Sequence, residues 1–129
     1  MRIIYNFFIH LFHFSSSVVS LFNPKIKLFV NGVRSTLKQI KSTQDFGQPI
    51  WFHCASLGEF EQARPIIEKI KENTPDQKIL LTFFSPSGYE VRKNYPFADY
   101  VMYLPADTRK NAQQFITVVK PKMVVFVKY

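Results

Sequence analysis

The chain has 129 residues, of which 47% are apolar, and its 17 Lys and Arg against 9 Asp and Glu give a formal net charge of +8. This length is typical of one domain, and 14 Phe with 6 Tyr exclude a disordered basic tail. The single cysteine, Cys54, excludes a disulfide framework and leaves too few thiols for a structural zinc site. The positive charge leaves nucleic acid and an anionic membrane as candidate partners.

The excess of positive charge lies at the amino-terminal end. Residues 1–41 carry six basic side chains and no acidic one, whereas residues 42–129 carry 11 basic and 9 acidic side chains. The six are Arg2, Lys25, Lys27, Arg34, Lys38 and Lys41. Because the larger part of the chain is nearly neutral, we expect no nucleic acid partner.

Residues 1–24 form an apolar segment, because no charged side chain lies between Arg2 and Lys25. Two His and three consecutive Ser dilute its apolar character. Three interpretations stay open: a helix that anchors the chain across the membrane, a helix that lies in the membrane surface, and a cleaved signal peptide. If the segment spans, the basic juxtamembrane segment 25–47 places the following residues on the cytoplasmic side.

From residue 48 onward, short apolar runs alternate with helical patterns. The expected elements, in chain order, are strand 49–55, helix 59–73, strand 78–84, helix 89–95, strand 99–104, helix 108–119 and strand 122–127. Pro65 predicts a kink or a late start for the first of these helices. The alternation predicts an α/β fold over residues 48–129, with a Rossmann-like open parallel sheet and right-handed crossovers.

Open parallel sheets bind ligands at the carboxyl ends of their strands. The candidate functional loops are therefore residues 55–59, 85–88 and 105–108. Neither the glycine-rich dinucleotide fingerprint nor the P-loop motif is present, so a dinucleotide dehydrogenase and a P-loop enzyme are both unsupported.

Three of these segments carry family motifs. The sequence H-C-A-S-L-G-E at residues 53–59 resembles the H-A-A-S-V-G-E signature of the 3-deoxy-D-manno-octulosonic acid (Kdo) transferases of lipopolysaccharide synthesis. T-F-F-S-P-S-G at residues 82–88 is similar to the family's T-x-T-x-T-P-T-G loop, and Y-L-P-A-D at residues 103–107 to its Y-L-P-x-D. Pro121-Lys122-Met123 resembles the entry into the last strand of the family's first half, and Asn23-Pro24-Lys25 after the apolar segment agrees as well.

The resemblance implies a GT-B glycosyltransferase with two Rossmann-like halves, of which this chain corresponds to the amino-terminal, acceptor-binding half. The donor CMP-Kdo binds mainly to the second half, and the family pattern continues past Tyr129 into an E-x-W segment. The resemblance therefore predicts that residues 48–129 are an incomplete acceptor-binding domain, that the donor-binding domain is absent, and that the chain is inactive alone. It also implies a location at the inner membrane, with the catalytic domain facing the cytoplasm.

The resemblance further implies the roles of individual residues. Glu59 is the expected general base, which takes a proton from a sugar hydroxyl of a lipid A precursor. The helix macrodipole stabilises a negative charge at that position, and Gly58 leaves room for a sugar. The expected acceptor-binding residues are Ser56, Gly58, Ser85, Ser87 and Gly88. No metal and no cofactor is implied, since CMP-Kdo is a substrate.

Ser56 and Glu59 also match the S-x-x-E pattern of a helix capping box. A carboxylate engaged with the backbone is poorly free to act as a base, so we predict that Glu59 points into the cleft and does not close the box. Ser85 and Ser87 fit an anion-binding nest or an ordinary turn with a serine cap. Two alternative functions stay open: a non-catalytic membrane-tethered binding module and a different GT-B glycosyltransferase.

Overall fold

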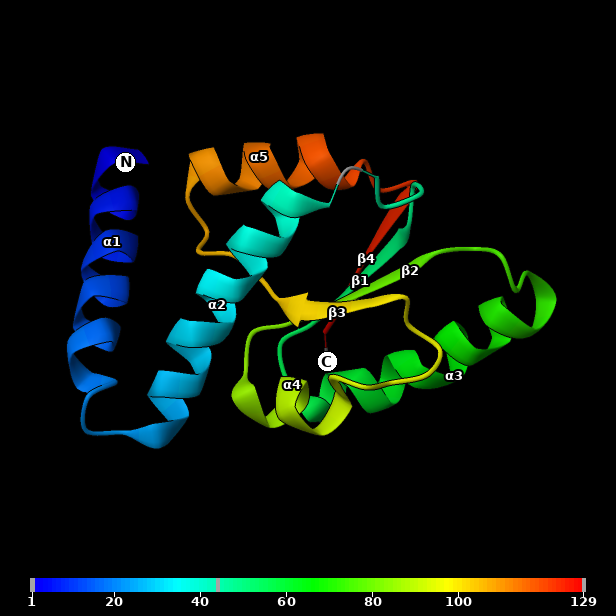
Figure 1. Cartoon of the computed structure of the whole chain (residues 1–129), viewed down its shortest axis with the longest axis horizontal. Helices are drawn as coiled ribbons and strands as arrows, with labels where there is room; N and C mark the ends of the chain where they lie inside the picture. Colours follow the sequence, from blue (N-terminus) through cyan, green and yellow to red (C-terminus); the bar gives the residue numbers. More distant parts are fainter. Residues whose placement is uncertain (1, 44, 129) are drawn as a thin grey trace.

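The computed structural model describes residues 2–43 and 45–128, and it has a four-stranded parallel sheet in the order β3-β2-β1-β4 (Figure 1). The strands are β1 (Ile50–Cys54), β2 (Ile79–Phe83), β3 (Tyr100–Tyr103) and β4 (Met123–Val127). The helices are α1 (Arg2–Val19), α2 (Pro24–Ser42), α3 (Leu57–Asn73), α4 (Pro86–Arg92) and α5 (Arg109–Val119). The predicted α/β class, the parallel sheet and the order of elements from residue 48 onward are confirmed.

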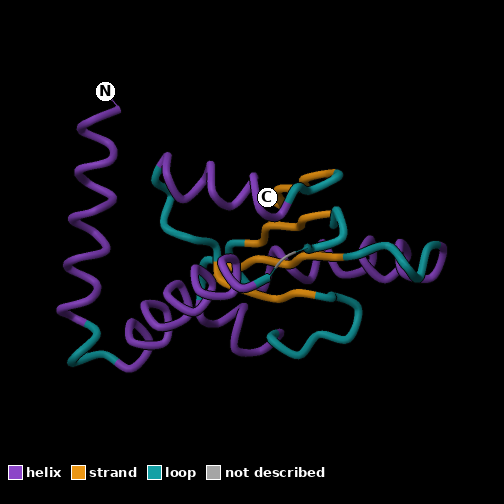
Figure 2. Tube along the Cα trace, turned by 45° about the horizontal axis from the view of Figure 1, so that its top comes forward, coloured by secondary structure: helices purple, strands orange, loops and turns teal. Residues whose placement is uncertain are grey.

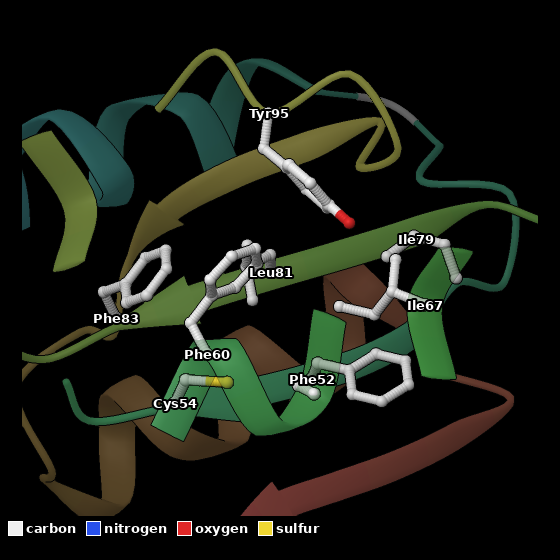
Figure 3. Close-up of a cluster of buried hydrophobic side chains, with 9 residues drawn as sticks. Phe52, Cys54, Phe60, Ile67, Ile79, Leu81, Phe83 and Tyr95 are labelled. Carbon is white, nitrogen blue, oxygen red and sulfur yellow. The ribbon is translucent and has the colours of Figure 1, made fainter. Parts of the chain in front are cut away.

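Helices cover both faces of the sheet, as expected when strands carry apolar side chains on both sides. On one face, Phe60 and Ile67 of α3 pack against Phe52 and Leu81 of the strands, together with Tyr95 after α4 (Figure 3). On the other face, α5 packs with the carboxyl end of α2 over the central strands. The buried side chains on this face are Ile40, Phe46, Trp51, Leu80, Met102, Phe115 and Val119.

Local capping sets where two helices begin. The first helix after β1 starts at Leu57, earlier than predicted, because Ser56 caps it, and Pro65 lies inside it. The late start that we predicted from Pro65 is therefore wrong. Likewise, α4 begins at Pro86, directly after its cap Ser85, and not at residue 89. Proline is favoured at the first helical position because it lacks only a donor that would stay unpaired there.

Segment 25–47, which the sequence marks as basic, contains most of helix α2. Asn23 caps α2, and Pro24 occupies its first turn. Phe29, Val30 and Val33 of α2 form a third buried cluster with Tyr103 of β3. A Cβ atom at Gly32 would lie 2.1 Å from the Tyr103 ring, so this close packing requires glycine. Helix α2 is therefore part of the packed structure and supports the end of β3.

Helix α1 lies outermost, beside α2, at one end of the molecule (Figures 1 and 2). His13 of α1 stacks on Phe29 of α2 at 6.0 Å between ring centroids, and the Tyr5 hydroxyl donates to Asp107 before α5 at 2.6 Å. Most of its large apolar side chains are exposed. Within residues 2–43 and 45–128, no helix has both the length and the apolar character required to cross a membrane.

At the amino edge of the sheet, Asp99 joins α3 to the start of β2. It accepts hydrogen bonds from Lys71 Nζ at 2.8 Å, from Lys78 Nζ at 3.0 Å and from the Ile79 amide at 2.8 Å. Burial disfavours the charged carboxylate, but these hydrogen bonds outweigh it and hold the pKa of Asp99 below its ordinary value. The ionised form of Asp99 is therefore the one that stabilises the fold.

We expect Asp99→Asn to lower the free energy of unfolding by about 1 kcal/mol at neutral pH, since solvent reaches both lysines and weakens each pair. A lowered native pKa means that this stabilisation is present above the ordinary carboxyl pKa and is lost as the pH falls through the native value. Thermal melts at pH 7 and pH 3 should show a larger difference from the wild type at pH 7 than at pH 3. Glu72→Gln, in an exposed pair with Lys69, is the control. An equal difference at both pH values would contradict the prediction.

Candidate functional site

Two loops of the candidate site meet at the carboxyl edge of the sheet. The amide of Ser85, after β2, donates to the carbonyl of Ala55, after β1, at 2.8 Å. A Cβ atom at Gly88 would lie 2.4 Å from the ring of Phe83 and 3.3 Å from the amide nitrogen of Leu57. Gly88 thus allows the first turn of α4 to pack against the start of α3, which brings the predicted residues of both loops together.

Glu59 closes the capping box of α3. The Ser56 hydroxyl accepts from the Glu59 amide at 3.4 Å, and Glu59 Oε2 accepts from the amides of Ser56, at 3.3 Å, and of Ala55. Our prediction that Glu59 leaves the box open is therefore wrong. The physical reason is that the two amides that follow β1 need an acceptor, and the Glu59 carboxylate lies within their reach.

The capping box occupies only one of the two carboxylate oxygens. Glu59 is 9% exposed, and Oε1 accepts no hydrogen bond from the described residues, nor is it among their buried unpaired atoms. A carboxylate has about four lone-pair sites, so Oε1 can still accept a hydrogen bond. The cap therefore orients the carboxylate and leaves Oε1 without a partner among the described residues.

Gly58 and the two serines of the second loop differ in exposure. Gly58 is exposed, and the nearest neighbour of an added Cβ would be the Ser56 hydroxyl at 3.9 Å. Ser85 Oγ accepts from the Ser87 amide at 3.3 Å and lies 2.8 Å from Ser87 Oγ. The serine-cap interpretation of this turn is thus confirmed, and Ser87 remains exposed.

Comparison with known proteins assigns the chain to a family. A family model described as 3-deoxy-D-manno-octulosonic-acid transferase (kdotransferase) matches residues 28–129, which include both loops. The chain belongs to the Kdo transferase family. The recognition made from the motifs at residues 53–59, 82–88 and 103–107 is therefore confirmed.

Several curated relatives carry the same name. The 3-deoxy-D-manno-octulosonic acid transferase of Haemophilus influenzae is 29% identical over 89% of this chain and 30% of its own length. That of Aquifex aeolicus is 36% identical over 61% of this chain and 22% of its own. The probable mitochondrial 3-deoxy-D-manno-octulosonic acid transferase of Arabidopsis thaliana is 35% identical over 64% of this chain and 19% of its own length. The chain thus spans less than a third of the length of these relatives.

In this Kdo transferase family member, His53 and Cys54 end the strand that leads to Glu59. Trp51 Nε1 donates to Thr82 Oγ1 at 2.8 Å, and His53 Nδ1 lies 2.9 Å from the same hydroxyl. Burial lowers the pKa of His53, although the charge of Glu59 partly offsets this effect. Burial, followed by the charge of Glu59, raises the pKa of the Cys54 thiol to about 12. Cys54 is therefore a packing residue, since the thiolate is the nucleophilic form.

Arg92 makes a contact between two helices that the sequence analysis did not predict. Its guanidinium bonds Glu61 Oε1 at 2.6 Å and lies 5.0 Å over the ring of Phe60. These contacts join the carboxyl end of α4 to the first half of α3. No local signal in the sequence could have revealed the pair, because its partners are 31 residues apart.

Proposed function

We propose that this chain is the acceptor-binding half of an enzyme that transfers Kdo from CMP-Kdo to a lipid A precursor in lipopolysaccharide synthesis. Its family membership and the names of its relatives support this assignment. The observation that carries it is the state of Glu59, with one oxygen fixed by backbone amides and the other free at the carboxyl edge of a parallel sheet.

Glu59 is the general base of the proposed reaction. Oε1 takes the proton from a hydroxyl of the acceptor sugar. The oxygen of that hydroxyl then forms a bond to the anomeric carbon of Kdo, on the side opposite the leaving group. The bond from that carbon to the phosphate oxygen breaks, and CMP leaves with the electron pair. A base held in one orientation by two backbone amides loses little freedom when the acceptor binds, which favours this step.

The acceptor lies over the two loops in this proposal. Gly58 lets the sugar approach the backbone, and the hydroxyls of Ser56, Ser85 and Ser87 are available to its polar groups. Gly88 acts through packing, because it keeps the second loop against the first. Among residues 2–43 and 45–128, no three His, Cys, Asp or Glu side chains gather as a metal site, and the proposed step from this half uses none.

The proposal includes a second, donor-binding half, because the relatives are more than three times as long as their match to this chain. We therefore base the test on a joined protein, in which this chain is fused to the part of the Haemophilus influenzae relative beyond its match. With CMP-Kdo and a lipid A precursor, the joined protein should transfer Kdo, while the 129-residue chain alone should transfer none.

The two rival functions predict other results. A folded joined protein that binds CMP-Kdo but transfers only to a different acceptor identifies another glycosyltransferase. A joined protein that binds lipid A precursor with no transfer to any acceptor identifies a binding module. The intact Haemophilus influenzae relative, assayed under the same conditions, is the positive control.

We also propose that the chain lies on the cytoplasmic surface of the inner membrane. The side chains of Ile3, Phe7 and Phe14 on α1 are 63% to 85% exposed, and the five basic residues of α2 form no ion pair with a described residue. His13 stacks on Phe29, and Phe29 packs on Phe84 at 5.3 Å, next to Ser85. The apolar helix is therefore continuous with the edge of the candidate site, as access to a lipid-linked acceptor requires.

We expect the chain to bind vesicles of anionic phospholipid more tightly than neutral ones, and less tightly at high salt. Each lysine near an anionic surface contributes about 1 kcal/mol, so Lys25→Gln with Lys27→Gln should weaken sedimentation with vesicles about tenfold or more. Lys122→Gln with Lys128→Gln, at the far end of the chain, removes the same charge and should have little effect. Equal losses in both pairs would show that net charge alone attracts the chain, against a docking face on α1 and α2.

A further inference from the structure

Helix α1 turns polar side chains toward the rest of the chain and most of its apolar side chains toward solvent. Among its described side chains, the half-buried ones are Asn6, Ile9, His13, Ser16 and Ser17, most of them polar. The other sides of the helix carry large apolar side chains that are strongly exposed, such as those of Phe7 and Phe14. A helix on the surface of a globular domain normally has the reverse arrangement. Helix α1 therefore contributes mainly polar groups to the space between itself and α2.

A hollow of about 380 Å³ lies between the carboxyl end of α1 and the amino-terminal part of α2. The two helices lie side by side and are joined by a short turn (Figures 1 and 2). Ser17 and Ser20 line the hollow from the α1 side, and Lys27, Asn31 and Arg34 line it from α2. The three α2 residues are four and three positions apart, a spacing that places them on one face of the helix. Two cationic side chains and one amide thus share this hollow.

The positive charge of the hollow has no acidic partner among the described residues. Residues 2–41 contain no Asp or Glu, and neither Lys27 nor Arg34 forms an ion pair with a described residue. Asn31 makes no side-chain hydrogen bond with them either. The hydroxyls of Ser17 and Ser20 donate to backbone carbonyls of α1, at 2.8 Å and 2.6 Å. The donors left for a ligand are those of two cations and a neutral amide, a set that suits an anion.

The surroundings of the hollow indicate which anion fits there. A guanidinium presents a planar fork of N–H groups that matches two phosphate oxygens, and a lysine adds a point charge. Leu21 also lines the hollow, and at the turn Leu21 is 78% and Phe22 86% exposed. Exposed apolar side chains beside cationic ones are typical of segments that lie in the headgroup region of a bilayer. A phosphate that carries acyl chains matches both features, whereas a water-soluble phosphate leaves the apolar pair uncovered.

We infer that the hollow between α1 and α2 binds the phosphate of an anionic phospholipid. Lys27 and Arg34 contact the phosphate oxygens with Asn31 as a neutral donor between them, and the exposed apolar pair at the turn lies among the acyl chains. This inference rests on the membrane location proposed above and adds to it a site of defined composition. Because α2 also packs on Tyr103 at the end of β3, a lipid bound here sets the position of the candidate site relative to the membrane surface.

Charge-matched variants of α2 distinguish such a site from general attraction to an anionic surface. Lys27→Gln with Arg34→Gln removes two charges that line the hollow, and Lys38→Gln with Lys41→Gln removes two charges from the same helix outside it. Asn31→Leu removes a donor without a change in charge, and leucine favours both a helix and an apolar environment. All five side chains are exposed, so the variants should fold, which their thermal midpoints verify.

With vesicles of phosphatidylglycerol mixed with phosphatidylcholine, we expect the pair in the hollow to lower the affinity of the 129-residue chain about tenfold more than the pair outside it. Asn31→Leu should lower the affinity about threefold or more, although an added leucine would strengthen an unspecific apolar contact. Equal losses for the two pairs would overturn the inference, and so would an Asn31→Leu chain that binds as tightly as the native one. Both results leave the proposed membrane location intact.

A short-chain lipid tests the site in the absence of a membrane. Dihexanoyl phosphatidylglycerol below its micelle concentration should shift the amide NMR signals of Ser17 and Asn31 saturably in the native chain, and not in the Lys27→Gln, Arg34→Gln variant. Inorganic phosphate at the same concentrations should produce little shift, because it has no acyl chains. Absence of a saturable shift, or an equal shift with inorganic phosphate, would overturn the inference. A native chain that shows the lipid shift but does not bind vesicles contradicts the proposed location and leaves the phosphate site intact.

Discussion

Glu59→Gln should lower Kdo transfer by the joined protein about 10²- to 10⁴-fold, the range that a positioned general base contributes. The substitution is informative because a glutamine oxygen can still accept hydrogen bonds from the amides of Ala55 and Ser56 and close the capping box. The amide cannot take a proton from the acceptor hydroxyl. The thermal midpoint should therefore change little, while kcat falls and the KM for the acceptor stays near its native value.

Two further variants separate the base from the cap. Glu59→Ala removes both functions and leaves two backbone amides without their acceptor, so it should cost about 1 kcal/mol or more of stability in addition to activity. Glu72→Gln changes an exposed carboxylate near the end of the same helix, where it pairs with Lys69, and it should retain most of the transfer rate. A Glu59→Gln protein with transfer within a few-fold of the native rate would exclude Glu59 as the base.

The sequence predicts the sheet and its helices because each element carries its own local signal. The apolar runs around Phe52, Leu81 and Val125 indicate buried strands, and the spacing of Ala63, Ile67 and Ile70 indicates a helix. The same kind of signal was present for α2, in the cap-and-proline pair Asn23-Pro24 and in apolar residues at helical spacing from residue 26 to 40. Because α2 also carries five basic residues, we predicted a basic juxtamembrane segment there. In the structure these five side chains lie on the exposed side of a helix that packs on the domain.

The sequence predicts which residues form the candidate site, and this prediction contains no information on their geometry. The motif around Glu59 predicts both a helix cap and a general base. The sequence does not show which carboxylate oxygen of Glu59 accepts hydrogen bonds from the amides of Ala55 and Ser56. This pairing depends on where the end of β1 places the Ala55 amide relative to the first turn of α3, and that position is set by the packing of the sheet. The contact of Gly88 with Phe83 and Leu57 likewise depends on the position of α4 against α3 and has no local signal.

Gly88 and Gly58 form a matched pair in which the same added methyl group should have opposite effects. At Gly88 the methyl would lie 2.4 Å from the Phe83 ring and 3.3 Å from the Leu57 amide, so α4 must move. Overpacking of this kind costs about 1–3 kcal/mol, and Gly88→Ala should lower the thermal midpoint of the chain by about 5 °C or more.

At Gly58 the methyl would meet nothing closer than the Ser56 hydroxyl at 3.9 Å, and alanine favours a helix over glycine. Gly58→Ala should therefore leave the thermal midpoint unchanged or slightly higher. If the acceptor sugar approaches this position, the methyl displaces it from Glu59, and transfer by the joined protein should fall about tenfold or more. Scanning calorimetry of the chain and transfer assays of the joined protein give the two readings. A Gly58→Ala enzyme with native transfer would mean that no sugar approaches this turn of α3, because neither backbone strain nor packing requires glycine there.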